Sequence, residues 1–188
     1  MRVVSGGFLN RCLKAELRTI VFVFEFDMNE TNIKAIVVTV SDTRTEATDI
    51  SGVTLVGLLI GIGAEIVEKI ITSDDFENLR QTLFTLAERK DANLIVTTGG
   101  TGFAPRDNTP EATRSVIERE AQGISEAMRF QTMKNTPLSM LSRGVCGIRN
   151  QTLIINLPGS PKGVVECFEV IKPVLKHAIN LIAGQTAH

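Results

Sequence analysis

The sequence predicts an α/β protein, a three-layer α/β/α sandwich built on a mostly parallel sheet. Apolar runs rich in β-branched residues, at 35–40 and 94–98, are typical of strands covered on both faces. Amphipathic segments alternate with these runs, as they do where helices connect parallel strands. Two further strand-like segments, 141–148 and 151–157, flank a turn-like Arg149-Asn150 and indicate a hairpin. At least one strand should therefore run antiparallel to the others.

The first half of the pattern predicts three strands, at residues 35–40, 64–71 and 94–98. The first helix is expected between the first two strands, where Asp49 or Ser51 can cap its start and Gly61 can end it. Residues 76–89 repeat apolar side chains at helical spacing, which predicts an amphipathic helix with one buried stripe. The third strand runs directly into a glycine-rich loop.

The second half predicts three more helices around the hairpin. Thr109 and Pro110 favour a helix start, with the hydroxyl as cap and proline at the first helical position. A helix near 124–133 follows. Ser160 and Pro161 begin the last and longest helix in the same way, because apolar residues recur at helical spacing after them.

One folded domain is expected at residues 34–188, preceded by an N-terminal extension of uncertain status at 1–33. A chain of 188 residues is long enough to bury a substantial core. The extension is unusual because it contains four of the nine phenylalanines, Phe8, Phe22, Phe24 and Phe26. Residues 19–26 could add a strand to the domain, or translation could start at Met28; the second alternative is slightly favoured.

Composition excludes several classes of function. The net charge is −1 and there is neither Tyr nor Trp, so nucleic acid and anionic membranes are not expected partners. No apolar run is long enough to span a membrane, and the N-terminus lacks the pattern of a signal peptide. Three distant cysteines and two histidines fit neither a disulfide framework nor a zinc site. The cytoplasm is the expected location.

A glycine loop after the third predicted strand is the first candidate site. It comprises Thr97, Thr98, Gly99, Gly100, Thr101 and Gly102. Glycines let backbone N–H groups approach a ligand closely, and the next helix adds partial positive charge at its start. An ordinary tight turn is the alternative, but Arg106 and Asp107 in the same connection favour an anion-binding loop for phosphate.

Two further connections fall at the same edge of the predicted sheet. The turn before the last helix contains Gly159, Ser160 and Lys162, and could bind a second anionic group or serve only as a helix entry. Asp74 follows the second strand and could hold a divalent cation together with Asp107. Alternatively, Ser73 or Asp74 caps the following helix.

Four segments resemble, in order and spacing, the molybdopterin adenylyltransferase family, which comprises the MogA and MoaB proteins and the gephyrin G domain. They are Val38 to Asp42, Thr97 to Asp107 with the following Thr109 to Ala112, Leu141 to Arg143, and Thr152 to Pro161. The resemblance implies a trimeric α/β/α protein of molybdenum cofactor biosynthesis. Members bind molybdopterin and ATP, and with Mg²⁺ they transfer AMP to the terminal phosphate of the pterin and release pyrophosphate.

The resemblance also implies roles for individual residues. Asp74 and Asp107 match the two carboxylates important for activity, with Mg²⁺ as the ion they would hold. The substrate-binding positions that match the motifs or lie beside them are Thr98, Gly99, Gly100, Thr101, Gly102, Arg106, Ser142, Arg143, Gly159, Ser160 and Lys162.

Two departures keep a second hypothesis open. Many adenylyltransferases carry Pro-Asp-Glu where this chain has Ser73-Asp74-Asp75, and MoaB-like relatives bind pterin without all transferring AMP. A pterin-binding or scaffold protein without adenylyltransferase activity is therefore the alternative. No region resembles the molybdenum-inserting partner, so the product would be handed over to another protein.

Overall fold

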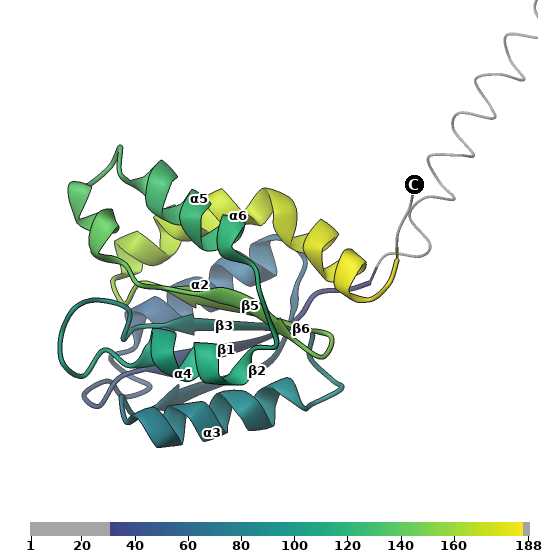
Figure 1. Cartoon of the computed structure of the whole chain (residues 1–188), viewed down its shortest axis with the longest axis horizontal. Helices are drawn as coiled ribbons and strands as arrows, with labels where there is room; N and C mark the ends of the chain where they lie inside the picture. Colours follow the sequence, from purple (N-terminus) through teal and green to yellow (C-terminus); the bar gives the residue numbers. More distant parts are fainter. Residues whose placement is uncertain (1–30, 186–188) are drawn as a thin grey trace, which may run out of the picture. The chain divides into compact units, whose positions relative to one another are not determined.

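The computed structural model describes residues 31–185, and from Asn32 onward these form one compact unit. Figure 1 shows its central sheet between two layers of helices, which confirms the predicted α/β/α sandwich. The phenylalanine-rich segment, the possible strand at 19–26 and the possible start at Met28 lie outside the described residues. The division into an extension at 1–33 and a domain at 34–188 stays a prediction.

The described chain has a six-stranded mixed sheet. Its strands are β1 (Lys34–Val40), β2 (Glu65–Thr72), β3 (Leu94–Thr98), β4 (Arg119–Glu120), β5 (Cys146–Arg149) and β6 (Thr152–Leu157). They are arranged in the order β2-β1-β3-β6-β5-β4. The first four in this order are mutually parallel, whereas β5 pairs antiparallel with β6 and β4 antiparallel with β5. The expected antiparallel hairpin is confirmed.

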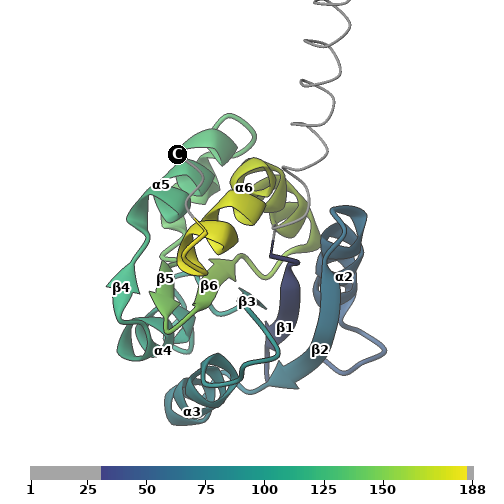
Figure 2. The same cartoon turned by 90° about the vertical axis from the view of Figure 1, so that its right-hand side faces the viewer.

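Helices cover both faces of the sheet. They are α2 (Ile50–Gly61), α3 (Phe76–Ala87), α4 (Thr109–Val116), α5 (Gln122–Thr132) and α6 (Pro161–Ile182), with a short 3-10 helix, η1 (Pro137–Leu141). Figure 2 shows α2, α5 and α6 on one face and α3 and α4 on the other. Alternate residues of β1 serve the two layers, because Val37 packs in the core under α2 and α6 while Ile36 packs in the core under α3.

Local side-chain chemistry explains where most helices begin. Asp49, one of the two expected caps, accepts from the Gly52 amide at 2.9 Å. Ser160 caps α6 as predicted, accepting from the Gly163 amide at 3.1 Å. The cap of α3 is Asp75 rather than Ser73 or Asp74. That correction leaves the Asp74 carboxylate available for another role.

Two expected details of the second half are wrong. Asn108 stands at the cap position of α4 without capping it, because its side-chain amide donates to the Asp74 carbonyl at 3.1 Å. The Thr109 hydroxyl, the expected cap, donates instead to the Gly99 carbonyl at 2.9 Å. The segment 141–148 is a strand only from Cys146 onward. Its earlier part is the last residue of η1 and a loop, in which the backbone N–H of Arg143 donates to the Thr101 carbonyl of the glycine loop rather than to a neighbouring strand.

Candidate functional site

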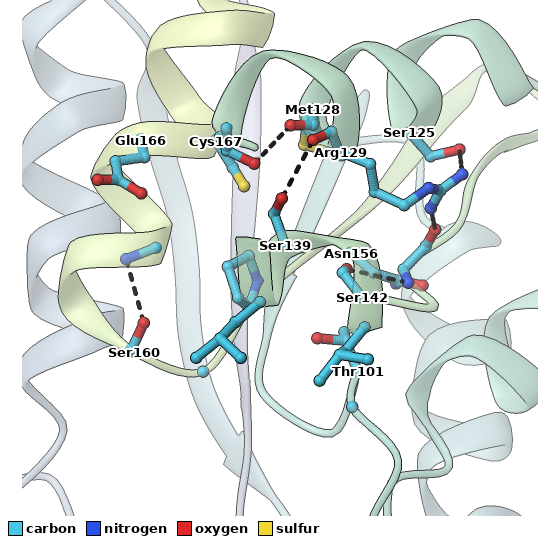
Figure 3. A pocket seen from close by; sticks show the side chains of 18 of the residues that line it. Thr101, Ser125, Met128, Arg129, Ser139, Ser142, Asn156, Ser160, Glu166 and Cys167 are labelled. Atoms are coloured by element: carbon cyan, nitrogen blue, oxygen red, sulfur yellow. Dashed lines mark hydrogen bonds between the residues drawn. The ribbon is translucent and has the colours of Figure 1, made fainter. Parts of the chain in front are cut away.

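The carboxyl ends of the parallel strands carry a cavity of about 450 Å³. It lies between the two glycine-containing loops after β3 and β6, and α5 and η1 form its opposite wall (Figure 3). Seven of the residues singled out from sequence line it: Gly100, Thr101, Gly102, Asp107, Ser142, Gly159 and Ser160. The ends of parallel strands are where ligands bind in open α/β sheets.

The first glycine loop has a backbone that only glycine adopts easily. Gly99 and Gly100 have φ angles of 109° and 63°, in the region that residues with a Cβ rarely occupy. A Cβ on Gly99 would lie 2.3 Å from the carbonyl oxygen of Val40 at the end of β1. The loop after β3 is thus pressed against the end of the neighbouring strand.

The second glycine turn packs directly on the first. The Thr98 hydroxyl donates to the Pro158 carbonyl at 2.8 Å, and a Cβ on Gly159 would lie 3.2 Å from the Cα of Gly99. Thr98 and Gly99 are buried beneath the cavity rather than lining it. Their position indicates that they hold the two loops together.

Arg143 fastens the first loop from the other side. Its Nε donates to the Gly102 carbonyl at 2.7 Å and its backbone N–H to the Thr101 carbonyl at 2.9 Å. The guanidinium also donates to the Asp107 carbonyl and pairs with Glu111. Arg143 lies in the wall of a second, open hollow of about 500 Å³ that shares Asp107 with the main cavity. These bonds hold the first glycine loop in its observed conformation.

Acidic side chains gather at the rim of the cavity. Asp42 and Asp74 exchange backbone-to-carboxylate hydrogen bonds of 3.2 and 3.1 Å, and Arg106 pairs with Asp42. The pKa of Asp74 is raised by its burial and by the negative charge of Asp107, with Arg44 acting in the opposite direction. The charge of Asp107 therefore acts on Asp74, and their joint binding of a cation stays a prediction.

The carboxylates of Asp74 and Asp107 are suited to a divalent cation that also binds phosphate groups. Among residues 31–185, no cluster of three or more His, Cys, Asp or Glu side chains could hold a metal ion by itself. Mg²⁺ binds through one or two carboxylates, with waters and substrate phosphates completing its octahedron. Burial and the negative charge of Asp107 raise the pKa of Asp74, and a bound cation would oppose both effects. The donor set therefore fits Mg²⁺ held jointly by the protein and a phosphorylated ligand.

The wall formed by α5 and η1 was missed by sequence reasoning. Ser125 and Arg129 lie one helical turn apart on α5 and both line the cavity, together with Ser139 of η1 (Figure 3). Arg129 donates to the Gly144 carbonyl at 3.0 Å, which ties α5 to the chain entering β5. The i, i+4 spacing of Ser125 and Arg129 was the available signal, but only the tertiary fold brings this face to the glycine loops.

Lys162, one of the singled-out residues, has a side chain that lies mostly in solvent. It is 78% exposed at its side chain, and its ammonium lies 3.8 Å from a carboxylate oxygen of Glu166, which lines the cavity. Arg106 is also largely exposed and is held at the rim through Asp42. Neither side chain lines the cavity itself.

The fold and the site define an α/β protein with a cavity between two glycine-containing loops at the carboxyl edge of its sheet. Residues 36–177 match the family described as "Probable molybdopterin binding domain". The chain belongs to this family, and the residues that line the cavity fall within the matched range.

Curated relatives match the chain over part of their length. A molybdopterin adenylyltransferase of Helicobacter pylori is 43% identical over 114 residues, which cover 61% of this chain and 65% of that protein. The molybdenum cofactor synthesis protein cinnamon of Drosophila melanogaster is 46% identical over 117 residues, or 62% of this chain and 20% of that protein. The chain thus spans less than two thirds of each of these relatives.

Solved structures match over nearly their whole length. The molybdopterin biosynthesis enzyme MoaB of Thermus thermophilus superposes with a TM-score of 0.75 at 41% identity, covering 81% of this chain and 97% of that one. The Mog protein of Mycobacterium ulcerans gives 0.75 at 37% identity, covering 82% and 100%. Within residues 31–185, no helix is both long and apolar enough to cross a membrane.

Proposed function

We propose that this protein is a molybdopterin adenylyltransferase of molybdenum cofactor biosynthesis. It transfers AMP from ATP to the terminal phosphate of molybdopterin and releases pyrophosphate. The observation that carries the proposal is the junction of a glycine-loop cavity with the Asp74–Asp107 pair at its rim. The names of the relatives in Helicobacter pylori and Escherichia coli support the same activity.

Backbone groups bind the phosphates in this proposal. The N–H groups of the loop from Gly100 to Gly102 and the start of α6 at Ser160 carry partial positive charge, which attracts anions. The wall of α5 and η1 offers hydroxyls at Ser125 and Ser139 and the cation of Arg129 for the polar edge of the pterin. Phosphate and pterin would thus occupy opposite sides of one cavity.

Asp74 and Asp107 hold Mg²⁺ in this proposal. The ion, when bound, neutralises negative charge that develops on the leaving pyrophosphate. Asp42 positions Asp74 through their reciprocal hydrogen bonds and orients Arg106 toward the rim. Arg143 keeps the loop and Asp107 in place from behind.

No enzyme nucleophile is needed, because the terminal phosphate of the pterin attacks the α-phosphorus of ATP. A new P–O bond forms there as the bond to pyrophosphate breaks. The nearest thiol agrees with this route: Cys167 lines the cavity, but burial raises its pKa to about 11. At neutral pH the thiol stays protonated and is a poor nucleophile.

Assembly and location follow the family resemblance. The protein acts as a homotrimer in the cytoplasm and passes adenylated molybdopterin to a molybdenum-insertion protein. Light scattering coupled to size exclusion tests the trimer directly. A monomer at micromolar concentration would contradict it.

The decisive experiment is a turnover assay with purified protein, ATP, Mg²⁺ and molybdopterin. Wild type is expected to release pyrophosphate and form adenylated pterin, and Asp107→Asn to lose about 10²–10³-fold in kcat. Asp91→Asn is the matched control, because Asp91 is exposed and precedes β3 at the opposite edge of the sheet. Normal pterin binding without turnover would sink the enzyme proposal and favour the pterin-binding or scaffold alternative.

A further inference from the structure

A buried ion cluster lies beneath the loop after β1, outside the cavity lining. The Asp49 side chain has no solvent exposure and accepts from the Thr39 hydroxyl at 2.8 Å and the Gly52 amide at 2.9 Å. Lys69 of β2 completes the cluster with its ammonium 2.9 Å from Asp49. A buried carboxylate is tolerated only when it is paired and hydrogen-bonded in this way.

Both members of the central pair are charged. Burial opposes ionisation of Asp49, but Lys69, the Gly52 amide and Thr39 outweigh it and hold the pKa of Asp49 below its usual value. The pKa of Lys69 is raised because its hydrogen bonds to Asp49 and Glu46 outweigh its own burial. The pair is thus a permanent feature of the fold at neutral pH.

Two side chains connect this cluster to the second glycine turn. Arg44 places its Nη1 3.9 Å from the Asp49 carboxylate, while its Nη2 donates to the Gly159 carbonyl at 2.6 Å. Ser51, in the helical turn that Asp49 caps, donates its hydroxyl to the same carbonyl at 2.7 Å. Two donors from one cluster therefore fix the peptide group that follows Gly159.

The position of Gly159 matters because the turn serves two purposes. Gly159 lines the cavity, and it also packs on Gly99 of the first loop. A small displacement of the turn therefore changes the spacing of both loops. Such a displacement weakens binding of any ligand that spans them, although no residue touching the ligand has changed.

We propose, on the basis of the adenylyl-transfer function above, that Lys69 and Asp49 are positioning residues that act through Arg44 and Ser51 on the Gly159 turn. They set the spacing of the two glycine loops without touching substrate. Arg44 has one nitrogen, Nη1, that is buried and makes no hydrogen bond. The attraction between this nitrogen and Asp49 is thus what orients the guanidinium toward Gly159.

The test compares Ser51→Ala and Lys69→Met with Lys34→Met. Lys34 is a suitable control because it also pairs across β1 and β2, with Glu65 at 3.9 Å, but at the far end of the strands and half-exposed. Ser51→Ala removes one of the two hydrogen bonds to the Gly159 carbonyl, and Lys69→Met removes the cation that pairs with Asp49, the partner of Arg44. Each change should raise the KM for ATP or molybdopterin about tenfold, the effect of losing one such hydrogen bond. The kcat should stay within about twofold, because ground-state and transition-state binding weaken together.

A merely structural role gives a different signature. If the variants only fold less completely, kcat falls with the folded fraction seen by circular dichroism and KM stays at the wild-type value; this result would overturn the proposal. An equal rise of KM in Lys34→Met would overturn it as well. If wild type shows no turnover, the adenylyl-transfer function fails, and the Kd for molybdopterin by titration calorimetry replaces KM. A weaker Kd in Ser51→Ala and Lys69→Met alone then supports the positioning role, and unchanged values refute it.

Discussion

Gly99 is required both by the backbone conformation of the first glycine loop and by its close packing against β1. Its φ of 109° and the 2.3 Å approach of a hypothetical Cβ to the Val40 carbonyl both exclude a larger side chain. Gly99→Ala should therefore reduce the free energy of unfolding by about 3 kcal/mol. Urea denaturation followed by circular dichroism measures the change.

The same substitution should have the opposite sign at Gly57. This glycine lies inside α2 on its exposed face, and a Cβ there would meet nothing within 4 Å. Gly57→Ala is expected to stabilise the protein by about 0.5–1 kcal/mol, because alanine restricts the unfolded chain and favours helix. Equal effects at Gly57 and Gly99 would contradict the strained loop.

Asp74 illustrates how a site residue can oppose stability. Its raised pKa means that the folded protein binds a proton at this carboxyl more tightly than the unfolded chain does. The free energy of unfolding therefore falls as the pH rises through the raised pKa. Asp74→Asn should melt at a slightly higher temperature than wild type at pH 8, whereas the proposed function expects it to lose AMP transfer. The difference should vanish below the ordinary pKa of 3.8, where the carboxyl is protonated in both the folded and the unfolded chain.

Asp91 provides a control, because its pKa is shifted in the opposite direction to that of Asp74. Arg89 lowers the pKa of the Asp91 carboxyl, so ionisation of this exposed group favours the folded state above its ordinary pKa. Asp91→Asn should leave the melting temperature at pH 8 unchanged or slightly lower. Differential scanning calorimetry between pH 3 and pH 8 tests both variants, and a lower melting temperature for Asp74→Asn at pH 8 would contradict the assignment.

At the scale of elements, Asn156 joins β6 to three neighbours. Its amide donates to the hydroxyls of Thr97 in β3 and Thr113 in α4 at 3.0 and 2.9 Å, and its side-chain carbonyl accepts from the Val145 amide at 3.1 Å. Asn156→Ala leaves those buried groups unpaired and should cost about 2–4 kcal/mol in the free energy of unfolding. Gln81→Ala on the exposed face of α3 should change it by less than about 0.5 kcal/mol. Similar urea midpoints for the two variants would refute the role of Asn156.

The elements that sequence reasoning located well have strong internal patterns. The strand at 94–98 coincides with β3, and the amphipathic stripe at 76–89 contains α3, because buried faces impose their own periodicity. By contrast, β4 has two residues and η1 five, which is too short for any period to appear. The cap of α3 could not be chosen among Ser73, Asp74 and Asp75, since all three side chains can accept the same hydrogen bond.

The candidate site was predictable to the extent that its chemistry is local. Tight turns and helix starts require particular residue types, so such positions can be recognised in the sequence. Gly99 to Gly102, Gly159 and Ser160 were found in this way. Arg129 and Ser139 carry no such signal, because they reach the cavity only when α5 and η1 pack beside the loops. Lys162 was singled out because it lies two residues after Ser160, and its side chain is mostly exposed beside Glu166.

At the scale of the whole domain, the strand order explains why the loops converge. The chain leaves β6 toward α6 on one face of the sheet and leaves β3 toward α4 on the other. Between these adjacent strands the connections diverge, which opens a crevice at their carboxyl ends. The cavity between the two glycine-containing loops lies at that divergence. The parallel order of β2, β1, β3 and β6 then brings Asp74 and the Gly159 turn to the same edge.

This arrangement makes a prediction about metal and ligand acting on the stability of the whole molecule. No described cluster of three or more ligand side chains can hold a metal unaided, so EDTA should not change the melting temperature of the ligand-free protein. ATP with Mg²⁺ at about 100 times its Kd should add about 2.7 kcal/mol to the free energy of unfolding, or about 5–10 °C in Tm. EDTA should remove most of that increase, because the carboxylates at the rim then face the phosphates without a cation between them.

Differential scanning fluorimetry of wild type and Asp107→Asn, with and without chelator, measures the changes in Tm caused by ATP with Mg²⁺ and by EDTA. A fall in Tm when EDTA is added to the protein alone would mean that a resident metal supports the fold, and it would contradict a cation shared with the substrate.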